Sequence, residues 1–356
     1  MDVILMVLYV SIVLGVLVFI HEGGHYLAAR AFGVRVTEFM IGLPGPHLGF
    51  KRGETTFGIT AIPLGGYAKV CGMEPGQENP HIQDALAYMY KHGTADAEDV
   101  AASLGISVDD ALEVLWVLVD WGSIVGPLKS DTYNTFRTTG VVQPLRNINY
   151  VQGQPREFES AEALYESERS QTYRALPFWK RSVILLAGIA VNLIFAVVVI
   201  VMVYSVFGFD YTNEAGVVSH ITIPPLDALQ AGLAYIVAVC QAVIGLFNPA
   251  TVMDTVANST SVVGMAVLSK EYADAGILMF ILFCAMLSVS LGIMNLLPIP
   301  PLDGGRFVIE IFQKLTHKTV SYKAMNIMTM VGMILFIGFF VFMLNQDIQR
   351  FVFGNW

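Results

Sequence analysis

The feature that most constrains the fold is an uncharged, predominantly apolar run over residues 3–20, which ends in the polar sequence HEGGH at residues 21–25. A run of this length predicts a helix that spans a lipid bilayer. Ionisable side chains at membrane depth are costly, so those in HEGGH indicate a functional site. The alternative is a polar cap that only marks where the helix reaches water.

The spacing within HEGGH predicts a metal site. Residues four apart lie on one face of a helix, so His21 and His25 can bind one Zn²⁺ through neutral imidazole nitrogens. Glu22, beside the first histidine, is then the expected general base for the metal-bound water. The chain has 7 histidines in 356 residues, so this pattern rarely arises by chance.

Composition indicates a membrane protein, because hydrophobic residues make up 55% of the chain and charged residues only 14%. The net charge of −9 argues against a nucleic-acid surface over the chain as a whole. The 3 cysteines are scattered without a C-x-x-C pair, which argues against a disulfide framework or a thiolate zinc site. The first apolar run lacks the basic start and the cleavage site of a signal peptide, so we expect a retained transmembrane helix.

The sequence predicts four transmembrane helices. A fifth apolar segment, residues 226–247, is interrupted by Gln230 and Gln241. Of the 20 Lys and Arg residues, 14 lie between the first and second predicted spans, so this loop is expected to face the cytoplasm. The ends of spans one and three then share that side, and residues 226–247 are expected to lie on the outer surface or to re-enter the membrane. The four predicted spans are residues 2–22, 182–207, 276–297 and 325–344.

A zinc site built on HEGGH needs a third protein ligand. The segment NLLPIPPLDG, residues 295–304, follows the third span, and its three prolines interrupt a helix. Broken backbone at membrane depth is tolerated where it is buried in protein or lines a wet cavity. Asp303 is therefore the candidate third ligand, with the fourth position left for water. The alternative is that Asp303 only caps a helix that starts near Gly305.

Three motifs together resemble the site-2 protease family of intramembrane zinc metalloproteases, in particular its bacterial regulator-of-sigma type. They are HEGGH, the NLLPIPPLDG segment and GIAVN at residues 188–192. The resemblance implies an α-helical polytopic protein of the bacterial cytoplasmic (inner) membrane, with its active site toward the cytoplasm. It covers residues 1–75, about 170–207 and about 255–350.

The resemblance also implies roles for single residues. His21, His25 and Asp303 would be the zinc ligands and Glu22 the general base. Asn295 would hydrogen-bond the substrate backbone near the scissile bond.

Residues 57–69 are expected to form a β-hairpin, because a run with alternating side chains breaks at Pro63 before the turn at Gly65 and Gly66. In the family that the chain resembles, such a hairpin dips into the membrane and pairs with an extended substrate strand. Gly65, Gly66 and Tyr67 are the expected substrate-binding residues, because an exposed strand edge binds peptides through main-chain hydrogen bonds. The alternative is an ordinary hairpin that covers a loop.

Residues 77–150 are an insertion relative to that family. We expect helices over 81–92, 96–104 and from the cap Ser107 to Trp121, then short strands over 125–128 and 132–137. This order resembles a winged helix-turn-helix module. Residues 81–140 carry three Lys or Arg and nine Asp or Glu, a net charge of −6, so we expect a cytoplasmic module with a protein partner. DNA binding is the alternative.

Residues 208–225 are too short for the complete PDZ domain that relatives of this type usually carry there. The expected division has five parts: 1–76 with the first helix and the hairpin, 77–150 with the insertion, 151–207 with a linker and the second helix, 208–275 with the outer loop, and 276–356 with the third and fourth helices.

The predicted function is regulated intramembrane proteolysis by a zinc metalloendopeptidase. Its substrates would be transmembrane segments of membrane-tethered regulators, such as an anti-sigma factor or a transcription-factor precursor, or signal-peptide remnants. An upstream site-1-type protease is the expected partner. The alternative is a catalytically silent membrane scaffold that presents the cytoplasmic module.

Overall fold

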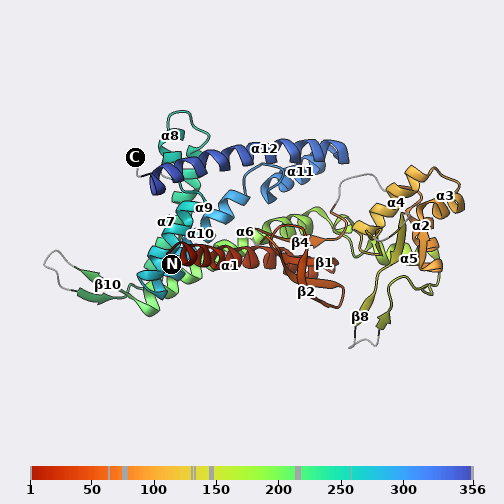
Figure 1. The fold of residues 1–356 in the computed structure, drawn as a ribbon, viewed down its shortest axis with the longest axis horizontal. Coiled ribbons are helices and arrows are strands. Elements are labelled where there is room, and N and C mark those ends of the chain that lie inside the picture. Colours follow the sequence, from red (N-terminus) through yellow and green to blue (C-terminus); the bar gives the residue numbers. More distant parts are fainter. Residues whose placement is uncertain are drawn as a thin grey trace. The chain divides into compact units, whose positions relative to one another are not determined.

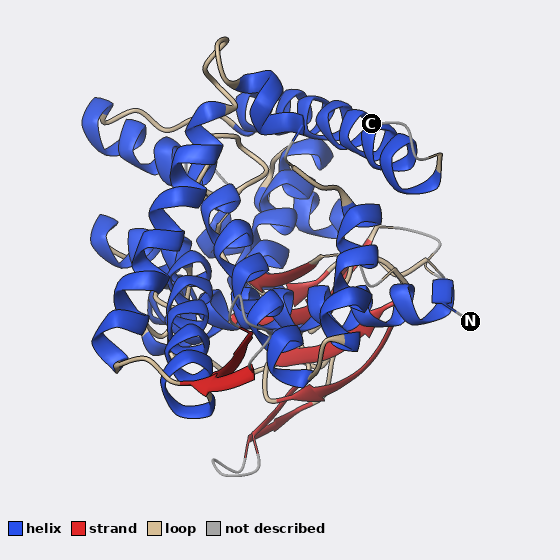
Figure 2. Ribbon diagram, turned by 90° about the vertical axis from the view of Figure 1, so that its left-hand side faces the viewer, coloured by secondary structure: helices blue, strands red, loops and turns tan. Residues whose placement is uncertain are grey.

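The computed structural model is mainly helical, with short strands in small sheets (Figure 2). It divides into two compact units. The first comprises residues 1–24, 185–308 and 326–356, and the second comprises residues 25–184 and 309–325. The division passes through continuous helices. The structure describes residues 2–62, 65–73, 79–129, 131, 134–143, 148–212, 218–257 and 259–353.

The first unit is built of long apolar helices, which Figure 1 labels. A strand pair, β10 (Phe209–Thr212) with β11 (Val218–Ile221), lies in sequence between the helix that ends at Phe207 and the helix that begins at Pro225. The helices are α1 (Asp2–Ala31), α6 (Phe178–Val201) with its π-helical continuation η3 (Met202–Phe207), α7 (Pro225–Gly245), α8 (Val252–Ala257), α9 (Val262–Asp274), α10 (Ile277–Asn295), α11 (Asp303–Thr316) and α12 (Tyr322–Asp347) with η4 (Ile348–Val352).

Five helical stretches in the described residues are long and apolar enough to cross a membrane, one more than the four we expected. The additional one is α7, which meets the same requirements of length and hydropathy. Only 11% of its most apolar window is buried inside the protein, so its side chains need an apolar surrounding such as lipid. A position of this helix on the outer surface, or re-entering the membrane, stays a prediction.

Helix α10 packs against both α6 and α7. A Cβ atom on Gly292 of α10 would lie 3.5 Å from the carbonyl oxygen of Ile189 in α6, which is an ordinary van der Waals distance. The side of α10 with Cys284 also meets Val13 and Leu17 of α1. The buried residues shared by α6, η3 and α10 are Ala196, Val199, Ile200, Val203, Leu282, Ala285, Val289 and Ile293.

A buried carboxylate joins the end of α12 to the start of α9. Asp347 accepts hydrogen bonds from the backbone N–H and the hydroxyl of Ser261, both at 2.6 Å, and from the N–H of Gly264 at 2.8 Å. These N–H groups belong to the first turn of α9, where a negative charge is favoured by the helix dipole. Asp347 therefore serves as the cap of a helix from another part of the chain.

The second unit contains a four-stranded sheet in the order β2-β3-β1-β4. The expected hairpin over residues 57–69 is wrong, because β1 lies between β3 and β4 and pairs with both. The hairpin partner of β3 is β2. Alternating side chains predict a strand but not its neighbour, which depends on distant contacts. The strands are β1 (Val36–Ile41), β2 (His47–Arg52), β3 (Thr55–Thr60) and β4 (Gly66–Val70).

The three helices expected in residues 77–150 are confirmed as α2 (Ile82–His92), α3 (Ala97–Leu104) and α4 (Val108–Asp120). Ser107 caps α4 as predicted, because its hydroxyl accepts from the N–H of Asp110 at 3.1 Å. The strands differ in position: β6 (Ile124–Val125) is shorter than expected and β7 (Thr135–Thr138) lies later.

Residues 132 and 133 of the expected second strand lie outside the described residues. A strand that the sequence did not predict, β5 (Thr94–Asp96), completes a sheet in the order β5-β7-β6.

The core of this module continues beyond residue 150. Leu164 of α5 (Ala161–Arg169) belongs to the same buried cluster as Leu86 of α2 and Leu115 of α4. A further strand pair, β8 (Val141–Gln143) with β9 (Ile148–Tyr150), precedes α5. The packed module therefore includes α5, which the sequence assigned to the linker.

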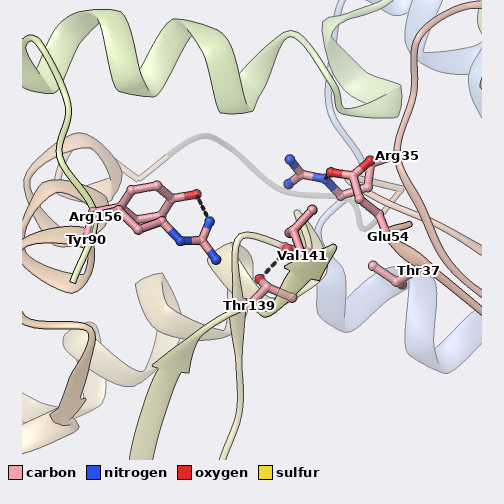
Figure 3. Close-up of a pocket in the computed structure, with 8 residues that line it drawn as sticks. Arg35, Thr37, Glu54, Tyr90, Thr139, Val141 and Arg156 are labelled. Carbon is pink, nitrogen blue, oxygen red and sulfur yellow. Dashed lines mark hydrogen bonds and ion pairs between the residues drawn. The ribbon is translucent and has the colours of Figure 1, made fainter. Parts of the chain in front are cut away.

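Arg35, just after α1, joins the sheet to this module. Its guanidinium donates to Glu54 at 3.0 Å and to Glu168 of α5 at 2.8 Å, and also to the backbone oxygen of Trp121 at 3.1 Å. Burial alone would lower the pKa of Arg35, but the charge and hydrogen bond of Glu168 raise it above its ordinary value. Figure 3 shows Arg35 beside Glu54 at a small cavity that Thr139 and Arg156 also line.

Candidate metal centre

The HEGGH sequence lies within α1, which continues to Ala31. His21 and His25 are one turn apart on this continuous helix, and both are buried, at 7% and 8% exposure. A Cβ atom on Gly24 would lie 2.6 Å from the carbonyl oxygen of Ala187 in α6. Glycine is therefore required at this position for the close contact between α1 and α6, whereas a Cβ atom on Gly23 would meet nothing within 4 Å.

Asp303 is held by the broken segment between α10 and α11. Helix α10 ends at Asn295, the prolines prevent its continuation, and α11 begins at Asp303. The connection folds back over the first turn of α11, because a Cβ atom on Gly304 would collide with the backbone of Leu296 and one on Gly305 with that of Ile299. These two glycines therefore allow the tight turn that sets the position of the carboxylate.

The two elements bring the predicted ligands together. The Nε2 atom of His21 lies 3.0 Å from the Oδ2 atom of Asp303. One ligand atom from each of His21, His25 and Asp303 lies within 4.8 Å of the others. In the part of the chain that the structure describes, this is the one group of three or more such side chains with that spacing.

Each histidine also makes a hydrogen bond on the side of its Nδ1 atom. His25 Nδ1 lies 2.8 Å from the carbonyl oxygen of Ile184, and His21 Nδ1 lies 3.2 Å from the side-chain nitrogen of Asn192. Histidines that bind metals commonly use their second nitrogen in this way, which orients the ring. Two imidazoles and one carboxylate form a donor set suited to Zn²⁺, with a fourth position for water or substrate.

These two partners were not predicted as site residues. Asn192 is a buried amide in the apolar part of α6, and an isolated polar residue at membrane depth is a signal that points to function. Ile184 acts through its backbone carbonyl, which leaves no signal in the sequence.

Two other predicted residues lie outside the three-residue ligand group. Glu22 is half-buried and follows His21 on α1. Asn295 is the last residue of α10, and its side-chain nitrogen donates to the carbonyl oxygen of Leu291 at 3.0 Å. Their expected roles as base and as substrate-binding amide therefore rest on sequence position.

The predicted substrate-binding residues Gly65, Gly66 and Tyr67 lie at the start of β4 in the second unit. Gly65 has a φ of +85° and accepts a hydrogen bond from the N–H of Gly42 at 2.7 Å. The hydroxyl of Tyr67 donates to Glu38 at 2.7 Å, and burial together with this carboxylate raises the tyrosine pKa. Among the described strands β4 pairs only with β1, so it is an edge strand of the sheet.

The protein has several helices that can span a membrane, and the two histidines of its HExxH motif meet an aspartate at one site. This arrangement is typical of a membrane metalloprotease. The comparison with known families agrees. The model of peptidase family M50 matches residues 9–339. The chain belongs to this family, the site-2 proteases, and is a zinc-dependent protease.

Individual relatives match over nearly their whole length. The regulator of sigma-W protease RasP of Bacillus subtilis is 22% identical, with 95% of this chain and 97% of the relative covered. The protease Eep of Enterococcus faecalis is 25% identical, with coverages of 96% and 98%. A protein named as a zinc metalloprotease in Agrobacterium fabrum is 28% identical, with coverages of 96% and 95%.

Proposed function

We propose that this protein is an intramembrane endopeptidase that cleaves the transmembrane segments of membrane-tethered proteins. The observation that carries the proposal is that ligand atoms of His21, His25 and Asp303 lie within 4.8 Å of one another, with both histidines on a helix that is apolar enough to span the membrane. A ligand group at membrane depth gives hydrolytic chemistry access to peptide bonds that lie in the bilayer.

The three candidate ligands would hold Zn²⁺, which when bound lowers the pKa of a coordinated water and polarises a carbonyl group. Glu22 would take the proton of the attacking water and later give it to the leaving amine. The side-chain nitrogen of Asn295 is used inside α10, so its amide oxygen would accept an N–H of the substrate backbone.

A transmembrane substrate must unwind before it is cut, because a helical peptide bond is hidden from attack. The edge strand β4, which begins with Gly66 and Tyr67, is the proposed docking site for the unwound segment. Its pairing with only one neighbour among the described strands leaves main-chain groups available on the other side. We propose this strand edge as the substrate site in place of the hairpin that the sequence suggested.

The proposed substrates are anti-sigma factors, transcription-factor precursors or signal-peptide remnants, after a first cut by a site-1-type protease. The name of one relative, regulator of sigma-W protease, supports a regulatory substrate. The proposed location is the bacterial inner membrane, with the active site toward the cytoplasm, because 14 of the 20 Lys and Arg residues lie in the first long loop.

The module of α2 to α5 is the proposed binding site for a protein partner that carries a basic segment. Helix α4 exposes Asp109 and Glu113, and Trp116 on the same face is 53% exposed. A partly exposed tryptophan among carboxylates suits a partner that combines Lys or Arg with apolar side chains, and repels nucleic acid. The resemblance of this module to a winged helix stays part of the proposal.

The test of the proposed function is to purify the protein in detergent, count its bound zinc and assay cleavage of a model transmembrane substrate. We expect zinc in both the wild type and Glu22→Gln, but cleavage only in the wild type. Equal cleavage by both proteins would exclude Glu22 as the base. Protein without zinc and without cleavage would favour the rival function, a silent membrane scaffold.

A further inference from the structure

Asn192 is a fully buried amide in the apolar part of α6, and it contacts a candidate zinc ligand directly. Its side chain is 0% exposed, and its Nδ2 atom lies 3.2 Å from Nδ1 of His21. Its backbone oxygen accepts a hydrogen bond from the hydroxyl of Ser288 in α10 at 2.9 Å. The residue is therefore held from two sides, by α1 through its side chain and by α10 through its backbone.

The side-chain oxygen of Asn192 is buried and has no hydrogen-bond partner among the described residues. A buried amide oxygen that lacks a donor is unfavourable, because it loses its hydrogen bonds to water without replacing them. The buried residues that α6, η3 and α10 share are aliphatic, and the hydroxyl of Ser288 on α10 donates to the backbone oxygen of Asn192 instead of to its side chain. The position of this unpaired oxygen beside a candidate zinc ligand therefore needs a chemical explanation.

The reason lies in the imidazole. A neutral histidine carries one N–H group and one nitrogen lone pair, and a metal binds at the lone pair. Nε2 of His21 is the atom that faces Asp303, so Nδ1 must carry the hydrogen when His21 binds zinc. The Nδ1–H group then needs an acceptor. The amide nitrogen of Asn192 cannot accept, but a half-turn of the amide brings its unpaired oxygen to the same place.

We propose that Asn192 is a positioning residue, which accepts the Nδ1–H of His21 through its side-chain oxygen and so presents Nε2 to zinc. The inference rests on the proposed function, because it assumes that His21 is a zinc ligand. The carbonyl oxygen of Ile184 does the same for His25, at 2.8 Å. His25 is thus oriented by a backbone group and His21 by a side chain, which makes only the second contact open to mutation.

The test compares two substitutions at this position by zinc affinity, measured by competition with a chelator. Asn192→Asp keeps the shape and can only accept a hydrogen bond, so we expect zinc affinity within about 3-fold of the wild type. Asn192→Ala removes the acceptor, and we expect a loss of about 10–100-fold. Ser288→Ala is the matched control, because it removes the backbone contact of Asn192 and leaves its amide in place.

Thermal unfolding of the metal-free proteins is measured in parallel, so that a loss of zinc affinity is separated from a loss of fold. Equal zinc affinity in Asn192→Ala and the wild type overturns the inference. Equal losses in Asn192→Asp and Asn192→Ala also overturn it, since they would show that the amide nitrogen is the essential group. A wild type that binds no zinc at all overturns the proposed function itself and the inference with it.

Discussion

Glu168 is the group whose removal we expect to destabilise the second unit most clearly. It is 8% exposed and accepts three hydrogen bonds, from Arg35 at 2.8 Å, from Ser123 at 2.6 Å and from Tyr90 at 3.0 Å. Glu168→Gln keeps the shape but removes the charge that Arg35 faces. Breaking a buried ion pair costs about 3–5 kcal/mol, and we expect about 3 kcal/mol because Glu54 remains 3.0 Å from Arg35.

The assay is denaturant unfolding of the purified protein in detergent, followed by tryptophan fluorescence and by the rate of proteolysis within α2 to α5. Glu166→Gln is the matched control, since it makes the same change on the exposed face of the same helix. We expect the control to stay within about 0.5 kcal/mol of the wild type. If Glu168→Gln and the control unfold at the same denaturant concentration, Arg35 does not hold the module to the sheet through this carboxylate.

The pH dependence gives a second check on Glu168. Burial would raise its pKa, but the charge and hydrogen bond of Arg35 hold that pKa below its ordinary value of 4.5. A carboxyl group whose folded-state pKa is lowered contributes stability above its unfolded-state pKa, and this is lost as pH falls through the folded-state value. The wild type is therefore expected to lose stability in acid over a range where Glu168→Gln changes less.

Three further predictions concern the helix contact, the strand edge and the module. Gly24→Ala is expected to separate α1 from α6 and to lower zinc content, while Gly23→Ala, whose Cβ atom meets nothing within 4 Å, keeps it; equal zinc in both would contradict the close contact. With the native Cys71, Cys240 and Cys284 replaced by alanine, a cysteine in place of Tyr67 is expected to cross-link to a cysteine in a substrate trapped by Glu22→Gln. A cysteine in place of Leu48, on the other edge of the sheet, is expected not to cross-link. A Lys-rich amphipathic peptide is expected to bind the protein more weakly as salt rises, and Trp116→Ala to weaken it further; tighter binding of duplex DNA than of the peptide would refute the proposed partner.

The helices and their ends could be predicted well because their signals are local. The i, i+4 spacing of His21 and His25, the cap at Ser107 and the prolines after α10 each act within a turn or two of the chain. Such contacts form wherever the helix forms, whatever lies beside it. The sequence by itself therefore determined four of the five apolar helical stretches, the spacing of His21 and His25 on one helix face, and helices α2 to α4.

Only the tertiary structure decided which distant groups meet. Strand β1 separates β3 from β4, and neither their alternating side chains nor the turn between them indicated it. The contact of Asn192 with His21 joins residues 171 apart, and that of Arg35 with Glu168 joins residues 133 apart. Strand pairing and buried hydrogen bonds depend on which elements pack together, and that choice is made by the whole folded chain.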